Sequence, residues 1–137
     1  MANAKLQTGR PLSPHLQIYK PMLTMMMSIV HRLTGAGLYF GSLLLAWWLI
    51  AAATGPDYFA FVNGLAGTLL GRLVLFGYTW ALIHHMLGGI RHFIWDTGRG
   101  FELPTVEFMV RASLAASLGL TVLIWAVALV YSGALLP

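Results

Sequence analysis

Three histidines lie close together in a stretch that is otherwise suited to lipid. His84, His85 and His92 belong to residues 83–96. His85 and His92 are seven residues apart, so on a helix they share one face and lie roughly 10 Å apart along its axis. Ionisable groups at membrane depth are costly and usually mark a cofactor, an ion path or a buried partner. This face therefore needs a chemical explanation.

His85 is the best candidate for a haem ligand. It lies about fifteen ångströms inside the helix end that Asp96 marks, well below the lipid headgroups. An imidazole at that depth suits axial ligation of haem iron. Gly88 and Gly89 would let a flat macrocycle or another helix approach, and for the two glycines taken by themselves ordinary helix packing is the favoured explanation. His84 points about 100° away from His85, which favours a packing role.

His92 lies one heptad nearer the surface than His85. It could meet a haem propionate or relay a proton, and an interfacial histidine without a role is the alternative. Asp96 follows four residues later and could accept the N–H of His92 or simply cap the helix.

A second polar stripe precedes the first long apolar run. Ser28, His31, Arg32 and Gly35 have spacings of three and four residues, which place them on one side of a helix. The guanidinium of Arg32 suits a carboxylate such as a haem propionate, or a carbonyl oxygen that gains negative charge on reduction. In the simpler interpretation Arg32 reaches the headgroups and Ser28 bonds its own backbone.

The composition is that of an integral membrane protein. Of 137 residues, 58% are hydrophobic and 9% are charged, with a mean hydropathy of +0.77. The absence of cysteine excludes disulfides, thiolate-bound iron–sulfur clusters and covalently attached c-type haem on this chain. The pI near 9.9 does not indicate nucleic acid, because the charges flank apolar runs and form no basic stripe.

Hydropathy predicts an all-α fold that forms a single transmembrane domain over residues 1–137. A non-helical arm at 1–21 contains Pro11, Pro14 and Pro21, and we see no cleavable targeting segment in it. Three spanning helices are expected at about 24–53, 65–95 and 108–133. A Gly-Pro turn at 54–57 separates the first two.

The positive charges predict the orientation of these spans. Seven of the eight Lys and Arg residues would lie on one side and Arg72 alone near the other. The positive-inside rule then puts the N-terminus in the cytoplasm and the C-terminus in the periplasm. The stripe at Ser28–Gly35 and the inner half of the second span would be neighbours on the cytoplasmic side. The seven cations are Lys5, Arg10, Lys20, Arg32, Arg91, Arg99 and Arg111.

Spacing alone leaves three functions open. Membrane haems commonly take two axial ligands from different helices, and three spans form a thin bundle, so a partner chain would have to complete a haem site. A small proton channel or transporter could instead use His84, His85 and His92 as a relay. A third possibility is a structural anchor without haem, in which the histidines only pack.

Three motifs resemble one known family. Residues 10–19, residues 28–35 and the stretch from His85 to Asp96 resemble, in order, the motifs of the cytochrome b membrane-anchor subunit of succinate dehydrogenase, respiratory complex II. The resemblance is to the mitochondrial and alphaproteobacterial branch. The doublet His84-His85 departs from many relatives, which have an aromatic or another residue first.

The resemblance implies a specific set of roles. His85 would bind the iron of a haem b shared with a second membrane-anchor subunit, which supplies the other axial ligand. Ser28 and Arg32 would bind ubiquinone, and His31, Arg32 and His92 would lie near the haem propionates. The chain would form half of a two-subunit helix bundle in the bacterial inner membrane. It would anchor an iron–sulfur subunit and a flavoprotein subunit, and succinate chemistry would take place on the latter.

Overall fold

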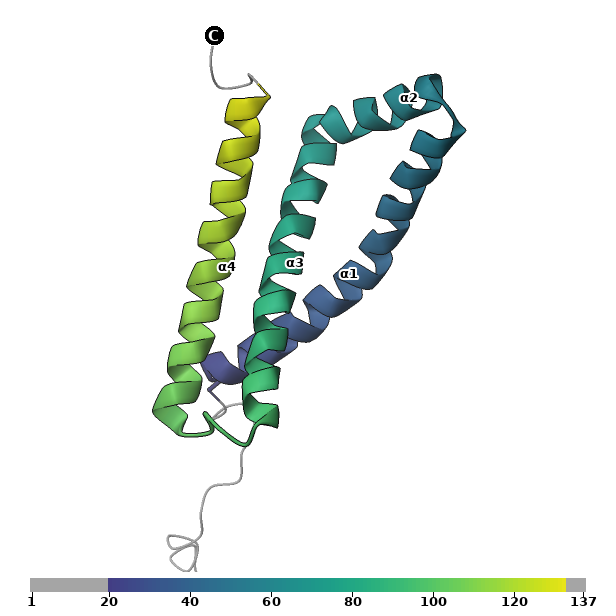
Figure 1. The fold of residues 1–137 in the computed structure, drawn as a ribbon. Helices are drawn as coiled ribbons and strands as arrows, with labels where there is room; N and C mark the ends of the chain where they lie inside the picture. The colour runs from purple at the N-terminus through teal and green to yellow at the C-terminus, as the bar shows by residue number, and fades with distance from the viewer. Residues whose placement is uncertain (1–19, 133–137) are drawn as a thin grey trace, which may run out of the picture.

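The computed structural model describes residues 20–132, and every regular element among them is a helix (Figure 1). The helices are α1 (Leu23–Thr54), α2 (Pro56–Gly67), α3 (Leu69–Asp96) and α4 (Leu103–Tyr131). α1, α3 and α4 are long and apolar enough to cross a membrane. The prediction of an all-α fold with three spans is therefore confirmed. Most of the predicted N-terminal arm, and the motif at 10–19, lie outside the described residues.

α1 is longer than a bilayer core requires. Its 32 residues extend roughly 48 Å, compared with about 30 Å of hydrocarbon, so it must tilt or project into the headgroups. It ends at Thr54, and Gly55 has a φ of 150°, a conformation that side chains rarely adopt. Pro56 then occupies the first turn of α2. The predicted Gly-Pro turn is thus present.

The second span, expected at about 65–95, begins at Leu69, and the separate helix α2 before it was not predicted. The helix is interrupted at Thr68. The Thr68 hydroxyl accepts a hydrogen bond from the backbone N–H of Gly71 at 3.1 Å and caps α3. The preceding residues form the separate helix α2, which at 12 residues is too short to span. Pro56 in its first turn, followed by Asp57, is a helix-start signal that could have revealed α2.

The three long helices pack unequally (Figure 1). α3 and α4 run side by side, whereas α1 crosses α3 near the end away from α2 and then diverges, with α2 bridging the gap. Between residues 20 and 132 few apolar side chains are buried, namely Met27, Ala51, Val62, Ile83 and Val110. Such a thin bundle leaves most of its apolar surface for lipid or for other subunits.

Small polar residues are buried along α4. Ser113, Ser117 and Thr121 are buried, and each hydroxyl donates to a carbonyl of its own helix, at 3.0, 2.9 and 2.7 Å. Small side chains let two helices approach closely in a membrane, where no hydrophobic force drives them together. Within this stripe, Oγ of Ser117 meets α3 directly, at 3.3 Å from Nδ1 of His84.

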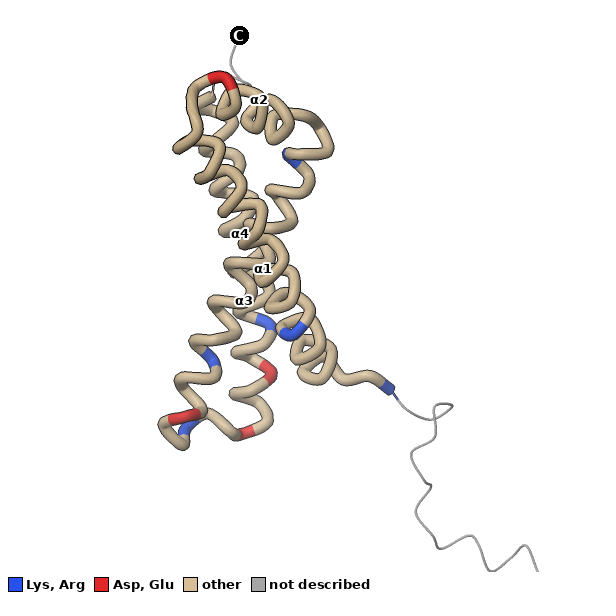
Figure 2. The backbone as a smooth tube through the Cα atoms, turned by 90° about the vertical axis from the view of Figure 1, so that its right-hand side faces the viewer, with Lys and Arg blue, Asp and Glu red and all other residues tan. Residues whose placement is uncertain are grey.

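Charged residues lie mainly at one end of the described chain (Figure 2). Arg72, in the first turn of α3, and Asp57, in α2, belong to the end that α2 occupies. The other described cations belong to the opposite half: Lys20, Arg32, Arg91, Arg99 and Arg111. We refer to the half with α2 as the outer half and to the other as the inner half.

Candidate functional site

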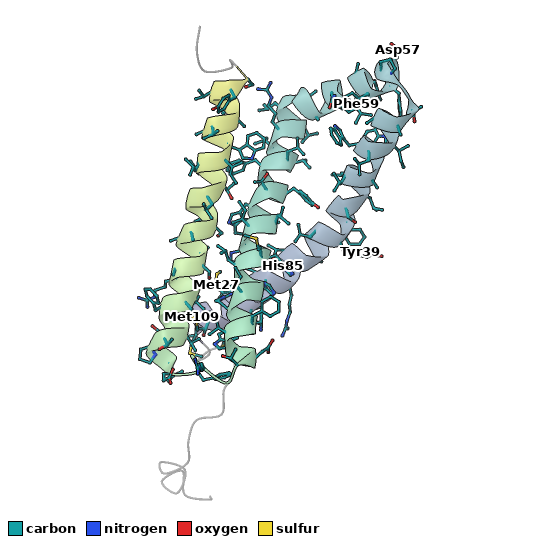
Figure 3. The ribbon with its side chains drawn as sticks, viewed as in Figure 1. Met27, Tyr39, Asp57, Phe59, His85 and Met109 are labelled. Atoms are coloured by element: carbon teal, nitrogen blue, oxygen red, sulfur yellow. The ribbon has the colours of Figure 1, made fainter. Side chains whose placement is uncertain are left out.

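His85 lies in the inner half, near the point where α1 passes α3 (Figure 3). It is half-buried, and α1 supplies its neighbours. Its Nδ1 lies 3.1 Å from the carbonyl oxygen of His31 and 3.4 Å from Oγ1 of Thr34. A carbonyl only accepts hydrogen bonds, so Nδ1 of His85 is the protonated nitrogen when it donates to His31. Nε2 then keeps a free lone pair.

His31 is packed directly against His85. The two imidazoles are stacked, with centroids 4.0 Å apart and planes within 2° of parallel. The ring of His92 lies 5.4 Å from that of His31 at an angle of 43°. We call His31, His85 and His92 the histidine cluster. The sequence prediction that the first-helix stripe and the second-span histidines are neighbours is confirmed for these residues.

His84 faces the other way, toward α4. Its side chain is fully buried and its Nδ1 lies 3.3 Å from Oγ of Ser117. Its ring also stacks on Trp80, with a centroid distance of 5.2 Å. The predicted packing role of His84 is therefore confirmed, and the two histidines of the doublet serve different helix interfaces.

The two glycines after the doublet differ in their surroundings. A Cβ atom at Gly88 would overlap the His31 imidazole, whereas a Cβ at Gly89 would meet nothing within 4 Å. Close helix packing thus explains Gly88. Asp96 was expected either to accept the N–H of His92 or to cap the helix. Among the described residues no hydrogen bond joins Asp96 to His92. The ring of His92 instead packs edge-on against Trp95 at 5.2 Å.

The stripe on α1 divides between two environments. His31 and Gly35 are half-buried against α3, but Ser28 and Arg32 are exposed on the surface of the chain. Neither Ser28 nor Arg32 therefore joins the histidine cluster directly. Both remain open to a ligand or to another subunit.

Two residues of this region did not emerge as candidates from the sequence. Thr34 lies within reach of His85, and its hydroxyl donates to the His31 carbonyl at 2.9 Å. Arg91 is 7% exposed, has its guanidinium 5.9 Å from the ring centre of Trp95, and has no hydrogen-bond partner for Nε among the described residues. Arg91 follows His84 by seven residues, and this spacing predicts that both lie on the side of α3 that faces α4.

The residues present fit a haem ligand set. A metal-bound histidine usually donates its other ring N–H to a carbonyl, which fixes the tautomer and orients the ring. His85 has this arrangement. Nδ1 of His31 is buried beside it without a hydrogen-bond partner among the described residues, which is consistent with a site that other groups complete.

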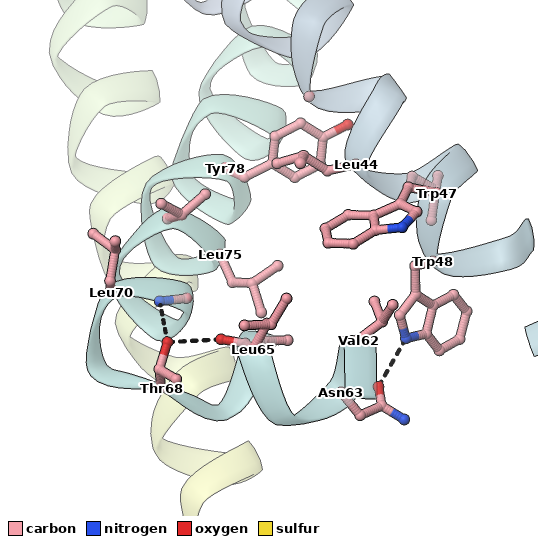
Figure 4. A pocket seen from close by; sticks show the side chains of 15 residues that line it. Leu44, Trp47, Trp48, Val62, Asn63, Leu65, Thr68, Leu70, Leu75 and Tyr78 are labelled. Carbon is pink, nitrogen blue, oxygen red and sulfur yellow. Dashed lines mark hydrogen bonds between the residues drawn. The ribbon is translucent and has the colours of Figure 1, made fainter. Parts of the chain in front are cut away.

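The outer half contains a different feature, a cavity of about 660 Å³ bounded by α1, α2 and α3 (Figure 4). Its lining is apolar and aromatic and includes no charged side chain. Trp48 lies at its wall and donates from Nε1 to Oδ1 of Asn63 at 2.9 Å, and Trp47 donates to the hydroxyl of Tyr58 at 2.8 Å. These two bonds tie α2 to α1.

Comparison with known proteins gives a consistent picture. A family model described as the succinate dehydrogenase/fumarate reductase transmembrane subunit matches residues 7–128. The succinate dehydrogenase cytochrome b556 subunit of Paracoccus denitrificans is 43% identical over 115 residues, covering 84% of this chain and 88% of that protein. The Rickettsia felis cytochrome b556 subunit is 38% identical over 121 residues, covering 88% and 94%. The mitochondrial cytochrome b560 subunit of Sus scrofa is 40% identical over 104 residues, covering 74% and 62%.

Proposed function

Because the chain belongs to the family of succinate dehydrogenase and fumarate reductase transmembrane subunits, we propose that it helps form a haem b site and a ubiquinone-reduction site. A membrane-anchor role follows from the family and from the three spanning helices. The finer proposal is a cytochrome b subunit of succinate:ubiquinone oxidoreductase. A flavoprotein subunit and an iron–sulfur subunit would carry succinate oxidation and deliver the electrons.

The observation that carries the haem proposal is the setting of His85. It lies in a spanning helix, and its Nδ1–H is engaged by the His31 carbonyl, so Nε2 is available to iron. The haem would supply one-electron redox chemistry, and a second anchor subunit would give the other axial ligand. His31, Arg32 and His92 would lie near the propionates, where Arg32 offers a positive charge.

The quinone proposal depends on Ser28 and Arg32. Both are exposed on the inner half of α1, where a neighbouring iron–sulfur subunit could cover them. The Ser28 hydroxyl would donate to a quinone carbonyl oxygen, and Arg32 would stabilise negative charge that develops on reduction.

The haem assignment is tested by replacing each member of the doublet. His85→Leu is expected to abolish or alter the b-type reduced-minus-oxidised spectrum of the purified complex. His84→Gln, which changes the adjacent packing histidine, is the matched control and should keep the spectrum. An unaltered spectrum in His85→Leu would rule this ligand out.

The quinone assignment is tested separately. Ser28→Ala and Arg32→Leu should depress quinone reduction while succinate oxidation by a soluble dye stays intact. Ser42→Ala and Arg72→Leu make the same changes in the outer half and should leave both activities unchanged. Normal quinone reductase activity in both inner variants would refute the proposal.

Two rival functions make different predictions for the purified protein. A proton channel with a histidine relay would be a colourless oligomer of one chain, and a haem-free anchor would be colourless but would retain its partner subunits. The visible spectrum, together with the co-purifying subunits, therefore separates all three functions.

The orientation is part of the same proposal. In a bacterial inner membrane the inner half would face the cytoplasm, because it carries most of the cations. The chain has no cysteine, so single cysteines can report topology. A membrane-impermeant maleimide should label Gly64→Cys but not Glu102→Cys in intact spheroplasts, and the reverse pattern would invert the topology.

A further inference from the structure

We propose that α1 positions His85, with His31 and Thr34 as positioning residues that set the ring plane and the donor strength of the haem ligand. This inference rests on the proposed ligand role of His85. It goes beyond that role because it assigns to α1 a function in tuning the haem, separate from any contact with propionates or quinone.

The first support is a reciprocal exchange of ring and glycine between α1 and α3. The His31 ring of α1 occupies the space above Gly88 of α3, where any Cβ would overlap it. In return the His85 ring of α3 lies against Gly35 of α1, where a Cβ would be only 2.9 Å from Cε1 of His85. Each helix therefore supplies the gap that the other helix's imidazole fills.

The histidine rings account for Gly35 and Gly88, and a third glycine of α1, Gly41, faces the Tyr78 ring of α3, which a Cβ there would overlap. Gly37 of α1 and Gly89 of α3 lie one or two residues from Gly35 and Gly88, yet a Cβ at either position would meet nothing within 4 Å. A general approach of the two helices would not distinguish Gly35 from Gly37, or Gly88 from Gly89. The two histidine rings account for the absence of a side chain at Gly35 and Gly88.

Three contacts fix the His85 ring. The stack with His31, within 2° of parallel, sets its plane, and the wall at Gly35 limits its depth. The hydrogen bond from Nδ1 to the His31 carbonyl sets the rotation of the ring within that plane. Thr34 contributes a second oxygen at 3.4 Å from Nδ1 and donates its own proton to the same carbonyl.

These contacts have a consequence for a metal-bound ring. Hydrogen bonding at Nδ1 raises the basicity of the ligating nitrogen, and a more basic ligand favours the oxidised iron. Loss of an acceptor near Nδ1 should therefore raise the haem reduction potential. A shift of the ring plane should change the electron paramagnetic resonance signal of the low-spin ferric haem, which depends on the orientation of the axial rings.

The experiment uses the whole complex, with the haem potential and the resonance spectrum as readouts. Thr34→Val keeps the shape of the side chain and removes the hydroxyl, so the potential should rise, while Thr34→Ser should retain the wild-type value. Gly35→Ala should alter the resonance signal or release haem, while Gly37→Ala should do neither.

The outcomes separate this inference from the ligand assignment. If His85→Leu keeps the wild-type spectrum, the ligand role fails and the positioning role fails with it. If His85→Leu loses that spectrum but Thr34→Val and Gly35→Ala both keep wild-type potential and resonance signal, only the positioning role is overturned. Equal effects of Gly35→Ala and Gly37→Ala would also overturn it.

Discussion

α1 and α3 pack closely in the inner half of the molecule and lie apart in the outer half. In the inner half the helices cross, and histidine rings occupy the spaces beside glycines on the facing helix. In the outer half the helices diverge around an apolar cavity (Figure 4), and the indoles of Trp47 and Trp48 on α1 donate hydrogen bonds to α2. The inner half is tightly packed and polar, whereas the outer half is apolar and contains a cavity, with one close contact at its wall where Gly41 faces the Tyr78 ring.

The difference indicates where the chain tolerates change. A packed interface responds to a single added methyl group, because displaced atoms have nowhere to go. A cavity accommodates added volume without strain. Redox chemistry needs fixed geometry, so a site built on His85 belongs in the half where both helices constrain the ring.

The largest effect on stability is expected for Gly88→Ala. The new Cβ would overlap the His31 imidazole, and overpacking of this kind costs about 1–3 kcal/mol of unfolding free energy. Gly89→Ala adds the same atom into open space and should be neutral or stabilise the helix by up to about 1 kcal/mol. Denaturant unfolding of the purified protein in detergent measures both, and equal effects would contradict the interlocked inner half.

Ser117→Ala should have the next largest effect. It removes the partner of the fully buried Nδ1 of His84, and an unsatisfied buried polar group costs about 1–3 kcal/mol. Ser113→Ala is the matched control, because within residues 20–132 that hydroxyl bonds only to the carbonyl of Val110, and its loss should cost less. The same unfolding assay measures both variants. If Ser113→Ala loses as much unfolding free energy as Ser117→Ala, the contact between Ser117 and His84 contributes nothing specific.

Loss of the hydrogen bond between Trp48 of α1 and Asn63 of α2 should lower the free energy of unfolding by less. Trp48→Phe removes the hydrogen bond to Asn63 at an exposed position, where one such bond contributes roughly 0.5–1.5 kcal/mol. A double-mutant cycle with Asn63→Leu isolates the coupling between the two side chains. Zero coupling energy would mean that the bond does not hold α2 in place.

The smallest effect is expected for Ala66→Leu in the cavity wall. The larger side chain enters the cavity of about 660 Å³, so its effect should stay within about 1 kcal/mol and its sign should favour stability. A loss comparable to that of Gly88→Ala would show that the outer half is as tightly packed as the inner half.

Much of the fold could be predicted from the sequence. Long apolar runs determine spanning helices because an isolated helix satisfies its own backbone in lipid. α2 was missed because hydropathy merges it with the connection and the start of α3, although Pro56 and Asp57 mark its beginning. The break at Thr68 depends on one capping hydroxyl, which a hydropathy pattern does not register.

The candidate site was predictable in part. The spacing of His85 and His92 correctly gave one helix face, and the 100° turn correctly separated His84 from it. Proximity of His31 to the second-span histidines followed from the expected orientation. Direct stacking of His31 on His85, and the burial of Arg91, did not follow.

What the sequence determined by itself is therefore local: three spanning helices, and the residues that share a face on each one. Helical periodicity and hydropathy suffice for that, since both depend on neighbours along the chain. Only the tertiary structure decided which faces meet. It placed the His31 ring against Gly88 and the His85 ring against Gly35. The physical reason is that the crossing of two helices depends on the fit of ring and gap across the interface. Neither partner carries that information alone.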